Sequence, residues 1–507
     1  MGYRLEGFAE IGLDERMLEL LIAEHERQRV PHLEVLWRYF RNPLEADRLG
    51  GRPRSGQEAG LPSRLTGEAE PGLIDDRTRP RREVVVENDI AWRIQTMVDF
   101  MFGKPVQIVS TAPDEGRRRE IERVLDAVWE ASGGIGLLQD MALLGSVFGY
   151  VDLVVRLNEG MLAGGRAPLD SALRSGSGDA LAELVRIEPI DPRRGIPVID
   201  PDDYRKLAGY AVHFERELNE PEEKKRRGSG RWLRGRREAM PEGFSGPAPR
   251  RKRAAVTEIL GPGLRQVYEG GELVLEERSA LLPGVVPVVH VQNLSQPYEY
   301  EGLSEVEPLI ALQDELNTRL SDRAGRVTMQ SFKMYLAKRL DGFERVPAGP
   351  GVVWSTDDPE ASIEAFGGDG SSPSESEHID QIREAMDKIS SVPPLAGGVI
   401  RARIGNLSSA TALRITLMSL LSKTGRKRVN YGRGIAEASR MVLSALNASG
   451  AFRTSAEERG VRLIWPDPQP ADARTDVVAA QGKVNLGVPA ERVLNELGYG
   501  DADAGVQ

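Results

Sequence analysis

The side chains in this sequence that could do chemistry are few and scattered. The chain has no cysteine, which excludes disulfides, thiolate metal sites and a cysteine nucleophile. Its histidines lie far apart in the sequence, and none pairs with another at the spacing of a metal site. We therefore expect all of them to be structural or on the surface. They are His25, His32, His213, His290 and His378.

The sequence also lacks the usual catalytic and nucleotide-binding motifs. It contains no GxxxxGK[ST] phosphate loop, no GxGxxG after a predicted strand, no GxSxG and no HExxH. The nearest acidic pair, Asp357–Asp358, lies in a turn rich in proline and glycine, with no third ligand nearby. These observations predict a protein that is not an enzyme and that uses no cofactor or metal.

One basic segment stands out from this background. The stretch "PPLAGGVIRARIGNLSSATALRI", Pro393–Ile415, contains two prolines, three glycines and the pair Arg401 and Arg403. Proline and glycine predict an irregular loop, and a serine at 408 or 409 would cap a long helix that follows it. The sequence thus places a basic loop directly before one of its longest helices.

Length and composition predict a folded chain with more than one part. The chain has 507 residues, of which 40% are hydrophobic and 28% charged, and its formal net charge is −10. We find no uninterrupted apolar run near the length of about 18 residues that a membrane span needs. The acidic N-terminal stretch does not resemble a signal peptide, so we expect neither membrane insertion nor secretion.

The first 300 residues predict helices followed by strands. Apolar periodicity predicts helices over 13–40, 88–102 and 114–131, and an irregular arm over 48–82. β-Branched and aromatic runs predict strands over 145–157, 183–191, 207–215 and 284–293. The segment Pro221–Arg253 holds twelve Lys/Arg against four Glu, which is typical of an exposed loop or, alternatively, of a nucleic-acid contact.

The last 200 residues predict unusually long helices. A helix capped by Ser304 and Glu307 would run to Leu340 and be about 55 Å long. Another would run from Ser408 or Ser409 to Asn447 and be about 58 Å long. Between them lie a β-type excursion over 341–373, a helix over 375–390 and the loop over 392–407. Helices this long exceed what a compact domain needs, so we expect a subunit that packs beside copies of itself in a closed ring.

Several stretches in this order resemble the portal proteins, or head–tail connectors, of tailed phages. The resemblance depends on the order of the stretches more than on any one of them, and it covers roughly residues 15–450. One departure is Ala410, which stands where the family's S-G-x-A-L motif has glycine. The stretches are "NDIAWRIQTMVDFMFGKPV", "GSVFGYVDLVV", "RIEPIDPRRGIPVIDPDD", "YEYEGLSEVEPLIALQDELNTRLSDRAG" and "SVPPLAGG…GNLSSATALRI".

The resemblance implies an α+β fold that is mainly α, assembled from parts known in this family. These parts would be a wing over 1–303 with the basic loop 221–253, a descending stem helix over 304–340, a clip over 341–373, an ascending stem helix over 374–391, a tunnel loop over 392–407, a long wing or core helix over 408–450, and a crown with the C-terminal tail over 451–507.

The same resemblance implies a function and partners. The chain would form a ring, commonly of about twelve subunits, at one vertex of the capsid. Double-stranded DNA would pass through the ring during packaging and ejection. The partners would be the terminase large subunit, then the head–tail adaptor, together with the major capsid and scaffolding proteins, and no membrane. The protein would be assembled in the host cytoplasm and remain in the virion.

Two sets of site residues follow from the resemblance. The tunnel loop would meet the anionic duplex, so its arginines would contact phosphates independently of base sequence, unless they instead pair with acidic residues of the same or an adjacent subunit. The tunnel-loop set is Val399, Ile400, Arg401, Arg403, Ile404 and Asn406. The clip set, which would face the terminase and the adaptor, is Asp357, Asp358, Glu360, Glu364 and Asp369.

The stem and clip are strongly acidic, which suggests a channel that repels DNA. Residues 341–392 hold twelve Asp/Glu against three Lys/Arg. Two other classes of protein stay open at this stage: a ring-shaped DNA clamp or translocase of non-viral origin, although the chain lacks an ATP site, and an enzyme with an unrecognised site, such as a nuclease. Magnesium-dependent DNA cleavage would favour the nuclease.

We predict that neutralising four clip carboxylates alters docking of the motor or the adaptor without abolishing ring assembly. The variant combines Asp357→Asn, Asp358→Asn, Glu360→Gln and Glu364→Gln. Surface carboxylates contribute little to stability but steer association with a charged partner. Co-sedimentation with the terminase or adaptor measures docking, and native mass spectrometry measures assembly. Unassembled monomer in this variant would contradict the prediction.

Overall fold

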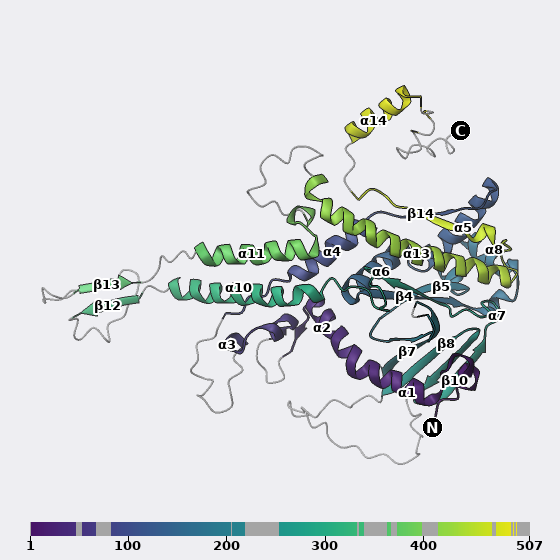
Figure 1. Cartoon of the computed structure of the whole chain (residues 1–507), viewed down its shortest axis with the longest axis horizontal. Helices are drawn as coiled ribbons and strands as arrows, with labels where there is room; N and C mark the ends of the chain where they lie inside the picture. Colours follow the sequence, from purple (N-terminus) through teal and green to yellow (C-terminus); the bar gives the residue numbers. More distant parts are fainter. Residues whose placement is uncertain are drawn as a thin grey trace, which may run out of the picture.

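Two antiparallel helices project from one end of an elongated subunit (Figure 1). The computed structural model describes residues 2–46, 53–66, 83–203, 205–217, 253–331, 334–338, 362–366, 373–397, 414–468 and 473–487, with residues 490 and 493. The rest of the described chain forms a helix-and-sheet body from which the two projecting helices extend. The fold is therefore α+β and mainly helical, as the sequence predicts.

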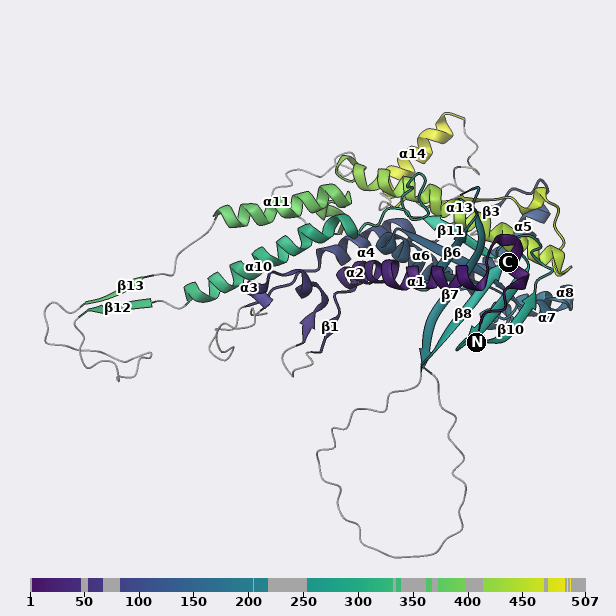
Figure 2. The ribbon, with the colours of Figure 1, turned by 60° about the horizontal axis from the view of Figure 1, so that its bottom comes forward.

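The predicted N-terminal helix over 13–40 is present but interrupted. It consists of α1 (Glu15–Glu24), a π-helical turn (His25–Arg29) and α2 (Val30–Arg41). Asn42 ends α2 in the left-handed conformation with φ 44°. A short 3-10 helix (Glu6–Ile11) and α1 pack on the five-stranded sheet (Figure 2).

The arm predicted to be irregular over 48–82 is partly regular. Within its described part, 53–66, β2 (Arg54–Ser55) pairs with β1 (Leu44–Glu45), and a 3-10 turn (Gly56–Gly60) leads to α3 (Ser63–Thr66). The fully buried Gln57 side chain donates hydrogen bonds to the Tyr39 carbonyl (2.7 Å) and to Asn88 Oδ1 (2.8 Å). These tertiary hydrogen bonds order a segment whose glycine and proline content alone predicts a loop.

The next three helices are α4, α5 and α6, and the position of α6 shows that one strand begins later than predicted. As expected, α4 (Asp89–Phe102) is capped by Asn88, and α5 (Glu115–Ala131) is capped by Asp114. The strand predicted from residue 145 instead begins at residue 150, because α6 (Gly134–Phe148) occupies the preceding residues. α6 is apolar on nearly every side, so it shows no amphipathic period. Within the described ranges no single helix is long and apolar enough to cross a membrane, although α5 and α6, bent by 66°, pass that test together.

Two antiparallel sheets form the centre of the body. The three-stranded sheet has the order β11-β4-β5 and the five-stranded sheet the order β10-β9-β8-β7-β6. The strands predicted over 183–191, 207–215 and 284–293 are confirmed as β5, β7 and β11. The sequence analysis missed β6, β8, β9 and β10, and the short helices α7 (Glu159–Leu162), α8 (Arg166–Ser175) and α9 (Gly178–Ala182).

The strand bounds of these sheets are as follows: β4 (Tyr150–Leu157), β5 (Val185–Ile190), β6 (Gly195–Ile199), β7 (Leu207–Glu217), β8 (Arg253–Gly261), β9 (Leu264–Glu269), β10 (Glu272–Arg278) and β11 (Val288–Gln292). In the register of the three-stranded sheet, Val154 of β4 lies opposite Val288 on one side and Glu188 on the other.

The projecting hairpin consists of α10 (Ile310–Ser331), entered through a 3-10 turn (Glu307–Leu309), and α11 (Pro373–Ser390). The prediction of a helix continuing to Leu340 is wrong, because β12 (Met334–Lys338) pairs antiparallel with β13 (Ser362–Phe366) at the far end (Figure 2). A strand partner distant in sequence overrides the helical period here. The helix predicted over 375–390 is confirmed.

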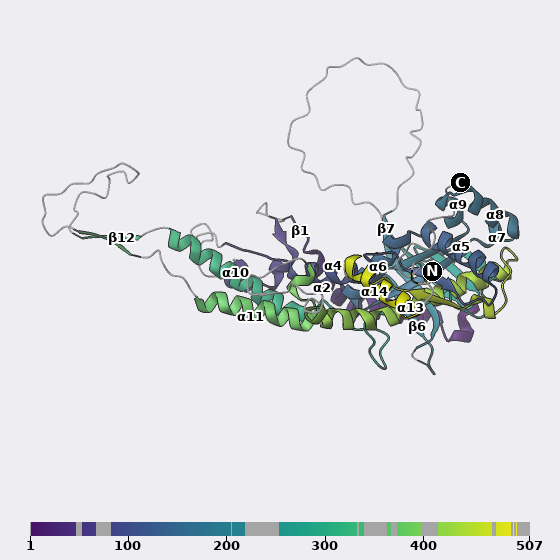
Figure 3. The ribbon, with the colours of Figure 1, turned by 90° about the horizontal axis from the view of Figure 1, so that it is seen from above.

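The longest helix, α13 (Met418–Ala448), runs from the inner end of α11 across the body and is about 46 Å long (Figure 3). Its predicted cap, Ser408 or Ser409, lies outside the described residues. After Gly450 the chain returns to the body, where β14 (Val461–Ile464) pairs with β3 (Gln107–Ser110). The chain then continues to α14 (Ala473–Asn485).

We predict that Gly145→Ala destabilises the subunit, because α6 and Tyr431 of α13 are in close contact there. A Cβ added at Gly145 would lie 1.9 Å from Tyr431 Oη, and that fully buried side chain is held by a hydrogen bond to Asn293. Overpacking of this kind costs about 1–3 kcal/mol of unfolding free energy, measurable by urea titration. Gly325→Ala is the matched control: it lies in α10, its Cβ would meet nothing within 4 Å, and we expect no destabilisation. Equal urea midpoints of unfolding for Gly145→Ala and Gly325→Ala would contradict the prediction.

Candidate functional site

The structure does not test the contacts of the predicted site residues. All six tunnel-loop residues, from Val399 to Asn406, lie outside the described residues, as do Asp357, Asp358, Glu360 and Asp369 of the clip. Glu364 lies in β13, at the position paired with Leu336 of β12. The structure does describe the segments on either side of these residues, namely η7 (Pro394–Gly397) and a helical segment over 414–416 that leads into α13.

A buried arginine holds the segment through which α11 enters the loop. Arg93 of α4 is only 2% exposed, and its Nη1 donates a hydrogen bond to the Val392 carbonyl (3.1 Å) and forms an ion pair with Asp387 (2.7 Å). Between these partners the backbone of Ser391 adopts φ 59°, the left-handed region that non-glycine residues rarely occupy. The direction in which the chain leaves α11 is thus fixed by a charged side chain from another helix.

A glycine is also required at position 397, a few residues after α11 ends. A Cβ placed on Gly397 would lie 2.3 Å from Trp92 Nε1, so the loop segment passes directly against the indole of α4. Trp92 and Arg93 are neighbours on α4, and together they contact both ends of the segment 392–397.

One buried carboxylate joins the hairpin to the long helix. Glu305, just before α10, forms ion pairs with Lys423 (2.5 Å) and Lys427 (2.6 Å) of α13. Lys427 Nζ also donates a hydrogen bond to Ser146 Oγ of α6 (2.7 Å). Lys423 Nζ donates one to the Ser390 carbonyl (2.8 Å) at the end of α11. The segment that leads into α10 and the end of α11 are therefore both bonded to the same turn of α13.

The electrostatics of this cluster follow from its unequal charges. Burial alone would raise the pKa of Glu305, but the Lys427 and Lys423 ammonium groups outweigh burial and hold that pKa well below its ordinary value. Burial lowers the pKa of Lys427 to about 8, because Glu305 is shared with Lys423 and offsets only part of the desolvation. The cluster carries two ammonium groups and one carboxylate.

The sequence analysis missed these residues, although one signal was available. On a helix, Leu420, Thr424, Lys427 and Tyr431 follow one another three or four residues apart, so they lie on the same face. A lysine inside an otherwise apolar stripe indicates a buried charge, which must have a partner. Nothing local to Arg93 or Glu305 distinguishes them from surface residues.

A second buried polar network joins the sheets. Asp152 of β4 accepts hydrogen bonds from Tyr210 (2.8 Å) and Tyr300 (2.8 Å), and it lies 2.7 Å from His290 Nδ1. His290 therefore has a structural place, as predicted. Within the described ranges no three side chains of the metal-binding types converge on a possible ion site.

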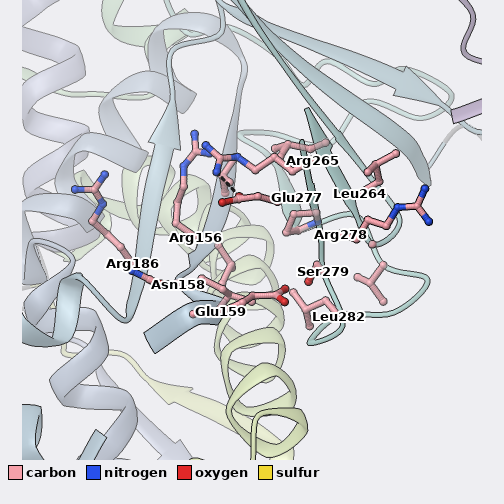
Figure 4. A pocket seen from close by; sticks show the side chains of 18 of the residues that line it. Arg156, Asn158, Glu159, Arg186, Leu264, Arg265, Glu277, Arg278, Ser279 and Leu282 are labelled. Atoms are coloured by element: carbon pink, nitrogen blue, oxygen red, sulfur yellow. Dashed lines mark hydrogen bonds and ion pairs between the residues drawn. The ribbon is translucent and has the colours of Figure 1, made fainter. Parts of the chain in front are cut away.

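A cavity of about 970 Å³ lies in the body between β4 and the β8–β9 hairpin (Figure 4). Its central charges are matched within the subunit. Arg156 pairs with Glu188 and Glu258, and Arg265 pairs with Glu258 and Glu277. Opposite charges of this kind hold the two sheets together, and they leave little excess charge to attract an ionic ligand.

Comparison with known proteins identifies one family. A sequence model of the family described as "Phage portal protein, SPP1 Gp6-like" matches residues 21–497. No curated protein matches the chain. Among solved structures, a chain of the virion of a native gene transfer agent particle is 13% identical, with 80% of this chain and 88% of that chain covered and a TM-score of 0.41. A chain from the neck of an empty gene transfer agent particle is 12% identical, with the same coverage and a TM-score of 0.42. Structural scores this low support no argument, so the assignment depends on the family match.

We predict that Glu305→Gln strongly destabilises the subunit, because it leaves two buried ammonium groups without a carboxylate. Breaking a buried ion pair in this way costs about 3–5 kcal/mol. The destabilisation is measured as a lower midpoint in urea at pH 7. The control is Glu437→Gln, which removes an exposed partner of Arg440 on the same helix and should cost at most about 1 kcal/mol.

The same pair of proteins tests the pH dependence. Because the native pKa of Glu305 is depressed, its stabilisation is present above the ordinary glutamate value of about 4.3 and is lost as the pH falls below it. The difference in unfolding free energy between wild type and Glu305→Gln should therefore shrink steadily on acidification. A difference that stays constant down to pH 3 would refute this account.

Proposed function

This chain belongs to the phage portal protein family, and we propose that its copies assemble into a ring at one capsid vertex that conducts double-stranded DNA during packaging and ejection. Its role as a portal, or head–tail connector, follows from the family, which is one of structural proteins. The single observation that carries the proposal is the family match, which extends over residues 21–497 of 507. Because the matched family consists of phage portal proteins, the match favours a portal over a non-viral DNA clamp.

The described architecture fits the parts of such a subunit. We assign α10 and α11 to the stem, the β12–β13 pair to the clip and α13 to the long core helix (Figure 1). The helices and sheets of the body form the wing, α14 lies in the crown, and the tunnel loop joins η7 to α13. The clip that we propose includes β12, so it would begin at or before Met334 and take in part of the range 304–340 given above for the descending stem helix.

The outer face of α11 supports a role as channel wall. Glu377, Asp380 and Glu384 lie three or four residues apart on this face, and all three are exposed. Among the residues that the structure describes, none of them has a basic partner. A row of unpaired carboxylates repels the DNA backbone and lets a duplex slide without being held.

The tunnel loop supplies the opposite charge. Arg401 and Arg403 stand in a segment, 398–413, that contains no acidic residue. Where the loop leaves α11 it is fixed by Arg93, which supports a loop held at its base and aimed in a constant direction. We propose that these arginines contact phosphates in a way that depends on salt and not on base sequence.

The partners proposed for the ring follow from its place in the particle. The clip would dock the terminase large subunit and afterwards the head–tail adaptor, and the wing would contact the major capsid and scaffolding proteins. The ring would assemble in the host cytoplasm and stay at the portal vertex of the virion, with no catalytic activity of its own.

Native mass spectrometry of the purified protein, with negative-stain images, tests the proposal directly. We expect a closed ring of about twelve copies with a central hole. Monomers or dimers at every protein and salt concentration would contradict it and would leave the exposed helix faces unexplained.

We predict that Arg401→Ala with Arg403→Ala leaves the ring intact but weakens its hold on DNA. In a DNA-retention assay, the slope of log affinity against log salt should fall by about 0.9 for each phosphate that the ring no longer neutralises. Packaging in an assay with the terminase should fall as well. The matched control is Arg440→Ala on α13, which removes an exposed arginine already paired with Glu437.

The salt-bridge alternative predicts the reverse pattern. If Arg401 and Arg403 pair with carboxylates of the same or an adjacent copy, the double variant should lower the thermal stability or the copy number of the ring, while the salt slope of DNA retention stays unchanged. That result would overturn the assignment of these two residues to phosphate contact.

A further inference from the structure

A second cavity, of about 490 Å³, lies where α11, α13 and the segment 294–305 meet. We call it the basic pocket, and we define it by Lys423, Arg426 and Arg433 of α13 together with Glu305 and Asn430, all of which line it. It lies at the junction between the proposed stem and the body, on the side of α13 that faces away from the body's core.

The charges around the basic pocket do not balance. Lys427, directly behind it, shares Glu305 with Lys423, so this cluster carries one excess positive charge. Arg426 and Arg433 add two more, since neither has an ion-pair partner among the residues that the structure describes. The charges differ from those of the cavity between β4 and the β8–β9 hairpin, where Arg156 is paired with two glutamates.

The two arginines are placed to act together. They are seven residues apart, which puts them on the same side of α13 and about 10 Å apart along its axis. Both are exposed. The sequence between residues 398 and 413 contains no Asp or Glu.

The rim of the basic pocket is apolar and open. Val429 lies between the two arginines and is 52% exposed, while Ile389 of α11 is 47% exposed and Leu303 is 42% exposed. Arginine beside exposed aliphatic side chains, with few free carboxylates, is the composition of a protein–protein contact surface. A free inorganic anion or a DNA backbone would gain nothing from this apolar rim, whereas an acidic residue on a protein surface would cover it.

We propose that the basic pocket is a socket that receives a carboxylate-bearing segment of the adjacent copy in the ring. The inference rests on the proposed ring, and it adds that each subunit completes the charge balance of its neighbour's stem junction. A ring requires two different complementary surfaces on each subunit, and this pocket would be one of them. Its filling would bury Val429 and neutralise the arginines in the same contact.

Charge reversal tests the socket. We expect Arg426→Glu with Arg433→Glu to raise the protein concentration needed for ring assembly by at least about tenfold, because the variant opposes like charges across the contact. Arg278→Glu on β10 is the matched control, since it reverses an exposed arginine on the wing. Circular dichroism of the unassembled chains checks that the reversed variant still folds.

Cross-linking tests the occupant. The chain has no cysteine, so Val429→Cys introduces the only thiol, to which a benzophenone maleimide can be attached. After irradiation of rings made from isotopically light and heavy chains, we expect mixed-label cross-links to a peptide that contains Asp or Glu. Val274→Cys on β10, where the valine is 62% exposed, is the control for nonspecific capture.

The outcomes separate the socket from the proposed function. If the wild type forms rings and the charge-reversed variant assembles equally well, the socket proposal is wrong but the proposed function stands. Cross-links confined to a single chain would also overturn the socket proposal alone. Inorganic phosphate could also stabilise the assembled rings, and do so only when Arg426 and Arg433 are present. That result would identify a free or DNA phosphate as the occupant of the basic pocket and would overturn the proposal. Wild type that remains monomeric under all conditions would overturn both.

Discussion

The arrangement of this subunit depends on a single carboxylate shared by two lysines. Glu305 stands where the body ends and the projecting hairpin begins, and it bonds Lys423 and Lys427 of the longest helix. Lys423 in turn bonds the last carbonyl of α11, at Ser390. The segment that leads into α10, the end of α11 and one turn of α13 therefore meet at a point that is buried and charged. Because a buried charge is costly without its partner, α13 cannot separate from the segment that holds Glu305 without leaving ions unpaired in the core.

This constraint has a mechanical meaning for a portal. The segment that we propose as the tunnel loop follows α11 in the sequence and precedes α13. Two cations hold carbonyl oxygens at the C-terminal end of α11: Arg93 of α4 bonds that of Val392, and Lys423 of α13 bonds that of Ser390. We propose that a displacement of this segment by DNA would act on α11 and, through Lys423, on α13.

Charged side chains are paired in some regions of the described chain and unpaired in others. In the body, arginines and glutamates are paired around the cavity between the two sheets, so that cavity carries matched charge. The outer face of α11 is acidic and unpaired, while the basic pocket on α13 has excess positive charge. Matched charge holds a subunit together, and we propose that the unmatched charge is directed to something outside it, namely DNA in one case and an adjacent copy in the other.

The sequence by itself determined the helical character of the chain, the positions of several of its helices and the family. Local signals suffice for these, since Asn88 and Asp114 cap helices wherever their neighbours are helical, and the stripe on α11 has a clear helical period. The sequence also suggested residues for the loop and clip, and nothing in the described structure tests their contacts.

Only the tertiary structure decided which charges are buried and where helices give way to strands. Glu305 and Arg93 look like surface residues until distant segments close over them, and Gln57 orders an apparent loop through hydrogen bonds to residues far along the chain. β12 forms because β13 is available to pair with it, although its own sequence follows a helical period. In each case the deciding partner lies tens or hundreds of residues away, and local sequence carries no record of such a partner.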